Sequence, residues 1–167
     1  MTLRLTAALS LLVLAAACTT HGFPQQEYDD ACMLIVADAY IPAAERFAEL
    51  SRSNPRYPEI WYNLGICLME TARYAEAEAA LLKAADLYEN AAMYDDKAGL
   101  RYDAMTTIGE VRLLQGDFAG AEEQFDRCLA ERSDRAAINA VVAAYIRRGF
   151  TDKAERFFAE RNIDVWM

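Results

Sequence analysis

The residues that could carry catalytic chemistry are few and widely separated in this sequence. Its single histidine, His21, lies in a short polar stretch, where no nucleophile and base can be paired around it. Adjacent carboxylates at Asp29–Asp30 and Asp95–Asp96 could serve general acid/base catalysis or bind a hard cation. Adjacent aspartates near a helix start are more commonly caps that the helix dipole favours. No phosphate-binding glycine loop, Cys-x-x-Cys pair or histidine metal spacing is present. We therefore expect no enzyme, no metal site and no cofactor.

The cysteines do not form a disulfide framework by their number or placement. Cys32, Cys67 and Cys128 each lie inside an apolar helical pattern, where a buried thiol acts as a small hydrophobic group. An odd set of three also cannot pair completely. Cys32 and Cys67 fall near the same level of two neighbouring predicted helices, so a bridge between them stays an alternative.

Composition favours a single helical domain. The chain has 167 residues, of which 54% are hydrophobic, and only 7 are Gly and 4 are Pro. The formal net charge of −9 argues against non-specific binding of nucleic acid, which needs clustered Lys and Arg.

The N-terminus carries an export pattern. Arg4 precedes an apolar run over residues 5–17, whose thirteen residues span about 20 Å as a helix, less than the ~30 Å hydrocarbon core of a bilayer. The run therefore predicts a signal peptide rather than a membrane span. Its last residues and the following cysteine, AAAC at 15–18, resemble the lipobox of bacterial lipoproteins. That resemblance implies that residues 1–17 are removed and Cys18 is acylated; an ordinary cleavage site is the alternative.

The same resemblance implies a location. Thr19, rather than Asp, follows the cysteine, which in a Gram-negative host implies delivery to the outer membrane. Residues 18–25 lack periodicity and predict a short tether. Two or more acyl chains hold a protein stably on a bilayer. We expect a lipid-anchored protein on the periplasmic face of the outer membrane.

A pattern of a small residue followed four positions later by a large one recurs along the chain. The pairs are Ala43 with Phe47, Ala77 with Leu81, Ala121 with Phe125, and Ala154 with Phe158. The alanines are separated by 34, 44 and 33 residues. Upstream, Trp61-x-x-Leu64-Gly65 is echoed by Met105-x-x-Ile108-Gly109.

These residues resemble the tetratricopeptide repeat (TPR), a helix–turn–helix unit of 34 residues. The resemblance implies an all-α, right-handed superhelix of about four repeats and eight helices. The 44-residue step predicts that helix B of the second repeat and helix A of the third are longer, with a corner at Asp95–Asp96; a disordered insertion is the alternative. The predicted repeats are a degenerate first unit at 26–57, then 58–94, 95–133 and 134–167.

Close packing of the two helices in each repeat explains the alternation of small and large residues. Small residues let two backbones approach, and large ones fill the spaces above and below. The residues predicted to pack in this way are Trp61, Leu64, Gly65, Ala77, Leu81, Gly109, Ala121, Phe125, Ala154 and Phe158.

The resemblance also implies a binding surface, since helix A lines the concave wall on which the family binds extended or helical peptides. Registering the repeats by their Leu-Gly pairs predicts a groove of Glu59, Tyr62, Asn63, Ile66, Met69, Glu70, Asp103, Thr106, Glu110, Leu113, Leu114, Asn139, Ala143, Ile146 and Arg147. An apolar groove with an acidic edge favours a neutral or basic segment with apolar anchors. Members that clamp a C-terminal carboxylate carry Lys and Arg where this chain has only Asn63, which disfavours that ligand class.

An adaptor or scaffold for other envelope proteins is the function that the resemblance implies, because TPR lipoproteins of this build assist pilus or outer-membrane complex assembly. Two other classes stay open. A periplasmic holdase would bind unfolded chains in the same groove without defined anchors. A structural subunit would associate with further copies through its convex or terminal surfaces, for which Val165 and Trp166 offer an apolar patch unless they fold back over the last helix.

Overall fold

The computed structural model describes residues 22–90, 97–161 and 163. The described residues form α-helices and contain no strand, so the predicted all-α class is confirmed. The helices are α2 (Gln25–Val36), α3 (Tyr40–Ser53), α4 (Pro58–Glu70), α5 (Tyr74–Asn90), α6 (Lys97–Gln115), α7 (Phe118–Glu131), α8 (Arg135–Arg147) and α9 (Thr151–Glu160).

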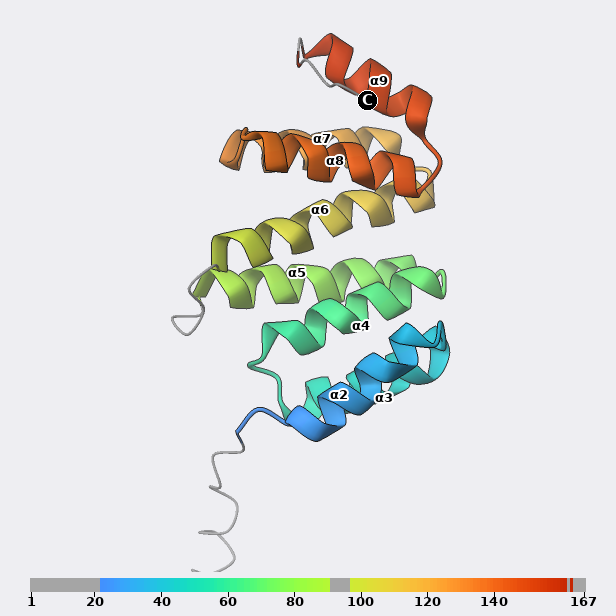
Figure 1. The fold of residues 1–167 in the computed structure, drawn as a ribbon, viewed down its shortest axis with the longest axis vertical. Helices are drawn as coiled ribbons and strands as arrows, with labels where there is room; N and C mark the ends of the chain where they lie inside the picture. The colour runs from blue at the N-terminus through green and yellow to red at the C-terminus, as the bar shows by residue number, and fades with distance from the viewer. Residues whose placement is uncertain (1–21, 91–96, 162, 164–167) are drawn as a thin grey trace, which may run out of the picture.

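The helices stack in sequence order as antiparallel pairs (Figure 1). Each helix packs against the next along the chain, from α2 on α3 to α8 on α9. The even-numbered helices also contact one another from α2 to α4, from α4 to α6 and from α6 to α8. This is the arrangement of an α-solenoid, in which each unit buries its apolar face against its neighbours.

The first helix of every pair ends in the same backbone conformation. A residue with positive φ follows each of them: Asp38 (54°), Ala72 (60°), Gly116 (80°) and Gly149 (79°). In the left-handed region the backbone N–H groups turn back to the last carbonyls of the helix, as in the hydrogen bond from Arg73 N to Leu68 O (2.9 Å). These turns set the structural register of the repeats independently of side-chain similarity.

The central pair of helices is the longest among the described residues. α5 has 17 residues and α6 has 19, whereas the other helices have 10 to 14. The extra length between the turns at Ala72 and Gly116 therefore falls largely within these two helices. The predicted corner at Asp95–Asp96 lies outside the described residues.

Glycine in the first helix faces a large side chain in the second. A Cβ atom added to Gly65 would lie 2.6 Å from Cγ of Leu81, and one added to Gly109 would lie 2.3 Å from Cε1 of Phe125. Real Cβ atoms do not approach carbon so closely, so these crossings require glycine. All the predicted packing residues are buried except Trp61, which is half-buried and donates its indole N–H to the carbonyl of Pro55 (2.9 Å).

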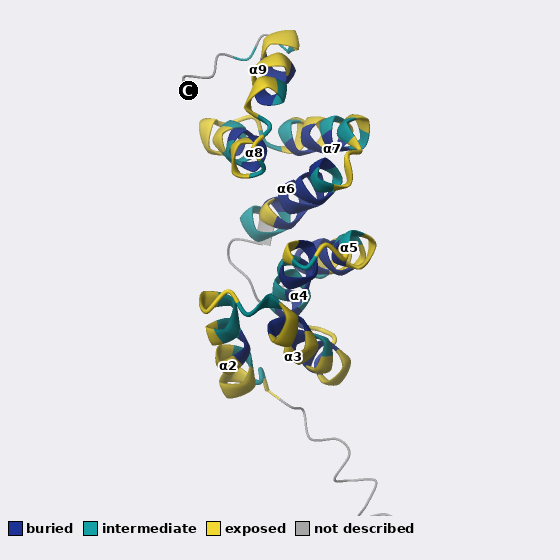
Figure 2. Ribbon diagram, turned by 90° about the vertical axis from the view of Figure 1, so that its right-hand side faces the viewer, coloured by how far each residue is buried: buried dark blue, intermediate teal, exposed yellow. Residues whose placement is uncertain are grey.

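Buried residues occur in every described helix along the stack (Figure 2) and form three core clusters. One cluster joins the third and fourth repeats through three aromatic rings, with Phe125 5.0 Å from Tyr145 and 6.2 Å from Phe157 between centroids. Phe157 and Phe158 are thus buried within the fold. The predicted terminal patch at Val165 and Trp166 lies outside the described residues.

The three described cysteines bear on the alternative of a disulfide bridge. Cys32, Cys67 and Cys128 are all free, so the alternative bridge between Cys32 and Cys67 is absent. Burial raises the pKa of the Cys67 thiol to about 12 and that of Cys128 to about 11, which keeps both protonated at neutral pH.

No helix within the described ranges is both long and apolar enough to cross a membrane. The predicted signal sequence and Cys18 lie outside those ranges.

Candidate protein-binding groove

A pocket of about 410 Å³ lies on the face formed by the first helices of the repeats. In Figure 2, α2 and α8 lie to the left of α4 and α6. We call this pocket the groove pocket. Its lining residues are Tyr62, Ile66, Met69 and Glu70 of α4, Asp103, Thr106, Thr107 and Glu110 of α6, Ala140 and Arg147 of α8, and Arg148 directly after α8.

Many of the predicted groove residues come together here, although they are up to 85 positions apart. Those that line the groove pocket are Tyr62, Ile66, Met69, Glu70, Asp103, Thr106, Glu110 and Arg147. The predicted residues outside its lining are Glu59, Asn63, Leu113, Leu114, Asn139, Ala143 and Ile146.

Leu113 lies in the core rather than in the lining of the groove pocket. Its side chain is 1% exposed and belongs to the core cluster that also contains Phe125 and Tyr145. The physical reason is that α8 packs across this end of α6 and covers the position. Asn63 is also engaged elsewhere, because its amide donates to the hydroxyl of Tyr28 (2.7 Å) and ties α4 to α2.

Three lining residues were missed. Thr107 and Ala140 follow Asn63 by 44 and by a further 33 residues, so they hold the same position in later repeats. The repeat spacing was therefore sufficient to find them. Arg148 corresponds by the same spacing to Thr71 and Gln115, which are turn residues without charge. The sequence register gave no signal for its role.

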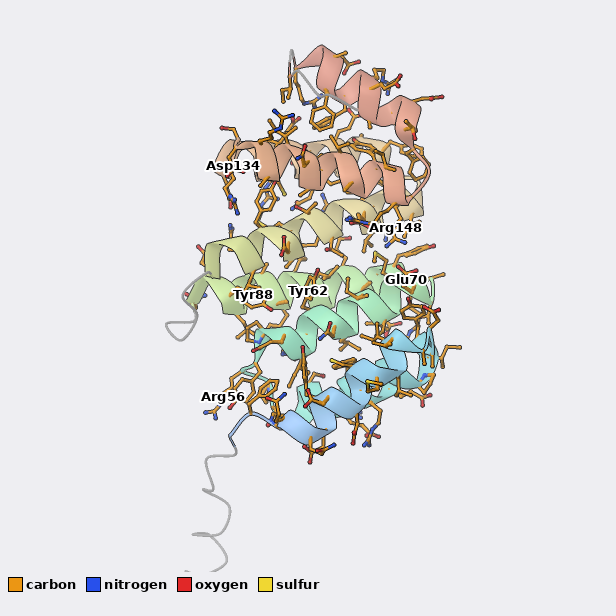
Figure 3. All side chains as sticks on the ribbon, viewed as in Figure 1. Arg56, Tyr62, Glu70, Tyr88, Asp134 and Arg148 are labelled. Atoms are coloured by element: carbon orange, nitrogen blue, oxygen red, sulfur yellow. The ribbon has the colours of Figure 1, made fainter. Side chains whose placement is uncertain are left out.

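The polar end of the groove pocket is an ion network that joins three helices. The carboxylate of Glu110 on α6 is 4% exposed and accepts hydrogen bonds from Arg147 and from Nε of Arg148 (2.9 Å). Nη2 of Arg148 also donates to Oε1 of Glu70 on α4 (2.8 Å). Glu70 and Arg148 face each other across the stack in Figure 3.

This network changes the expected charge of the groove. The sequence predicted an acidic edge, but the two arginines offset Glu70 and Glu110. Three carboxylates and two guanidinium groups line the groove pocket, so its formal charge is −1.

Tyr62 provides an uncharged polar group on the floor of the groove pocket. Burial is the main cause that raises the pKa of its phenol, and the charges of Asp103 and Glu110 act in the same direction. The hydroxyl of Thr107 and the charge of Arg147 oppose that increase and do not reverse it. The phenol thus stays protonated at neutral pH and remains a hydrogen-bond donor.

No group of three or more His, Cys, Asp or Glu side chains in the described part of the chain is arranged to hold a metal ion. The groove pocket offers apolar contact, hydroxyl groups and a neutralised ion network. Chemically, that is a surface for binding a polypeptide segment, whose side chains and backbone can use both kinds of contact.

The described helices stack as antiparallel pairs, and the groove pocket lies on the face formed by the first helices. This arrangement defines the chain as an α-helical repeat protein. Residues 56–131, which include all of α4 to α7, match the family model described as tetratricopeptide repeat. The central repeats are thus recognisable from sequence as tetratricopeptide repeats, and repeats of this type are protein-interaction modules.

A solved structure supports the fold over nearly the whole chain. The chain is similar to a thermophilic TPR protein of Thermus thermophilus, with a TM-score of 0.51 and 21% sequence identity. The similarity covers 93% of this chain and 80% of that protein. It therefore includes the degenerate first repeat and the last, which lie beyond the family match. No curated protein sequence matches this chain.

Proposed function

We propose that this protein is an adaptor that binds a segment of a protein partner in the groove pocket. The observation that carries the proposal is the groove pocket itself, which three successive first helices build from apolar side chains, hydroxyl groups and paired charges. Its volume of about 410 Å³ accommodates a few side chains of a bound segment.

The lining indicates the chemistry of the partner. Ile66, Met69 and Ala140 offer apolar contact, while Tyr62 offers a phenol hydroxyl group to a peptide backbone. A formal charge of −1 disfavours a strongly acidic segment. We therefore propose a segment with an apolar anchor that is neutral or carries a basic residue.

We further propose that Cys18 carries the lipid anchor and that the protein works on the periplasmic face of the outer membrane, in pilus or outer-membrane complex assembly. The AAAC sequence at 15–18 supports the anchor. Phe23 packs edge-on against Tyr28 (4.9 Å) and Tyr57 (5.0 Å), so the chain is held by the first repeat almost from the start of the described residues. Five residues from Cys18 to Phe23 span at most ~18 Å, which would keep the solenoid close to the bilayer.

The exposed face of α9 favours an adaptor over a subunit that polymerises end to end. Its exposed side chains are mostly polar, with Asp152, Glu155, Arg156 and Glu160. A polar end face of this kind terminates a solenoid. The α2 end is mixed. By the 34-residue spacing, the exposed residues Gln26 and Asp30 hold the positions of Ile60 and Leu64, which are buried residues of α4, but Met33, at the position of buried Cys67, is 64% exposed.

Affinity capture from envelope extract with matched variants tests the proposed function. Ala140→Arg places a long cationic side chain in the groove pocket, whereas Ala79→Arg makes the same change at an exposed position of α5. We expect one or a few proteins to be captured by the wild type and by A79R, and to be lost with A140R. Equal capture by all three would refute the groove as the binding site. Comparable binding to unrelated unfolded proteins would indicate a holdase instead.

A further inference from the structure

Arg148 makes contacts with two helices from a position outside any helix. It caps the C-terminus of α8, and its side chain is 16% exposed. Nε donates to Glu110 on α6, and Nη2 donates to Glu70 on α4, at 2.9 and 2.8 Å. The same Nη2 lies 3.4 Å from the sulfur of Met69. One side chain thus connects the second, third and fourth repeats.

These contacts join parts of the solenoid that do not follow each other in the stack. α8 packs against α6, α7 and α9, while α4 packs against α2, α3, α5 and α6. In a solenoid, contacts between neighbouring units set the small rotation at each step, and these rotations add up to the curvature. A contact that reaches past one unit constrains the sum of two rotations. The pair of Arg148 with Glu70 has this geometry.

The carboxylates of the ion network keep the guanidinium group of Arg148 charged and hydrogen-bonded. Burial acts to lower the pKa of Arg148, but the hydrogen bond to Glu70 and the charges of Glu110 and Glu70 outweigh it and raise the pKa. Glu110 needs its arginine partners, because a carboxylate that is 4% exposed is costly when unpaired. The planar guanidinium can serve two carboxylates at once, which an ammonium group does less well.

We propose that Arg148 is a positioning residue that holds α4 and α8 at a fixed separation across α6 and so sets the width of the groove pocket. Met69, Glu70 and Glu110, which it contacts, all line that pocket. The inference rests on the proposed function for its importance in binding. Its structural part, the control of curvature, holds whether or not the groove is the binding site.

A distance measurement between the second and fourth repeats tests the inference without a partner. Spin labels on noncanonical amino acids at the exposed positions Ala75 of α5 and Ala159 of α9 leave the native cysteines untouched. Double electron–electron resonance then gives the distribution of distances between the labels in the full protein. For Arg148→Ala, we expect the distribution to move to longer distances and to broaden relative to that of the wild type.

Two further variants make the outcome decisive. Arg46→Ala removes an arginine whose ion pair with Glu49 lies within α3, and we expect it to leave the distribution unchanged. Glu70→Ala removes the acceptor on α4 that pairs with Arg148 and leaves both arginines on Glu110, so it should shift the distribution in the same direction as R148A. E70A decides the question if R148A does not fold. Distributions of folded R148A or E70A that coincide with that of the wild type would overturn the proposal.

Discussion

Replacing Gly109 by alanine tests the claim that the helices of a repeat approach as closely as glycine allows. The added Cβ would lie 2.3 Å from Cε1, 2.6 Å from Cζ and 2.8 Å from Cδ1 of Phe125. The ring cannot turn away freely, because Phe125 is fully buried and packs against Tyr145 and Phe157. Either the ring or the backbone of α6 must therefore move.

Two opposing effects determine the size of the change. Overpacking of a buried site costs about 1–3 kcal/mol, and three contacts below 3.0 Å favour the upper part of that range. Alanine is better than glycine in a helix interior by about 1 kcal/mol, which offsets part of the cost. We expect Gly109→Ala to lower the free energy of unfolding by about 1–2 kcal/mol.

A double-mutant cycle, followed by urea unfolding and circular dichroism, separates these effects. Phe125→Ala removes the opposing ring and destabilises the protein by leaving a cavity. In that background Gly109→Ala should cost close to nothing, because the overpacking is relieved while the gain in helix propensity remains. An equal cost of Gly109→Ala in both backgrounds would show that the contact with Phe125 does not limit the approach of the helices.

Two other predictions concern the anchor and the fourth repeat. Cys18→Ser should release the protein from the outer-membrane fraction into the soluble periplasmic fraction, and unchanged fractionation with the membrane would exclude lipidation as the anchor. Asp134 caps α8, and the backbone N–H of Ala137, followed by Arg132, lowers the pKa of its carboxyl group. The stability from this lowered pKa is present above the unfolded-state pKa of about 3.9 and is lost as the pH falls through the folded-state value. Asp134→Asn keeps a capping side chain but cannot titrate, so the stability difference between the wild type and D134N should shrink between about pH 5 and pH 2; a constant difference would contradict the assignment.

The helices and their close crossings could be predicted because they depend on residues near one another in sequence. Gly65 and Leu81 are 16 positions apart, as are Gly109 and Phe125, and both pairs meet within one repeat. Trp61 shows the limit of this reasoning. A large residue in the repeat pattern was expected in the core, yet it is half-buried, because its indole N–H reaches the carbonyl of Pro55 at the edge of the stack.

The repeat spacing predicts part of the lining of the groove pocket. Tyr62 and Thr106 hold equivalent positions, and both line the groove pocket. Leu113 is equivalent to Met69 by the same spacing, but α8 covers it. Whether an equivalent position is open or covered depends on how far the next repeat is rotated, and that rotation is a property of the packed stack rather than of any one repeat.

The charge of the groove pocket also could not be predicted from the repeat spacing alone. Counting side chains on the first helices gave an acidic edge, since Glu70, Asp103 and Glu110 all face one side. The offsetting charge of Arg148 comes from a turn 78 residues after Glu70 and 38 after Glu110. It reaches them because the curvature brings the end of α8 over α4. Curvature thus determines which charges a partner meets, and if Arg148 in turn fixes the curvature, the shape and the charge of the binding surface depend on the same ion pairs.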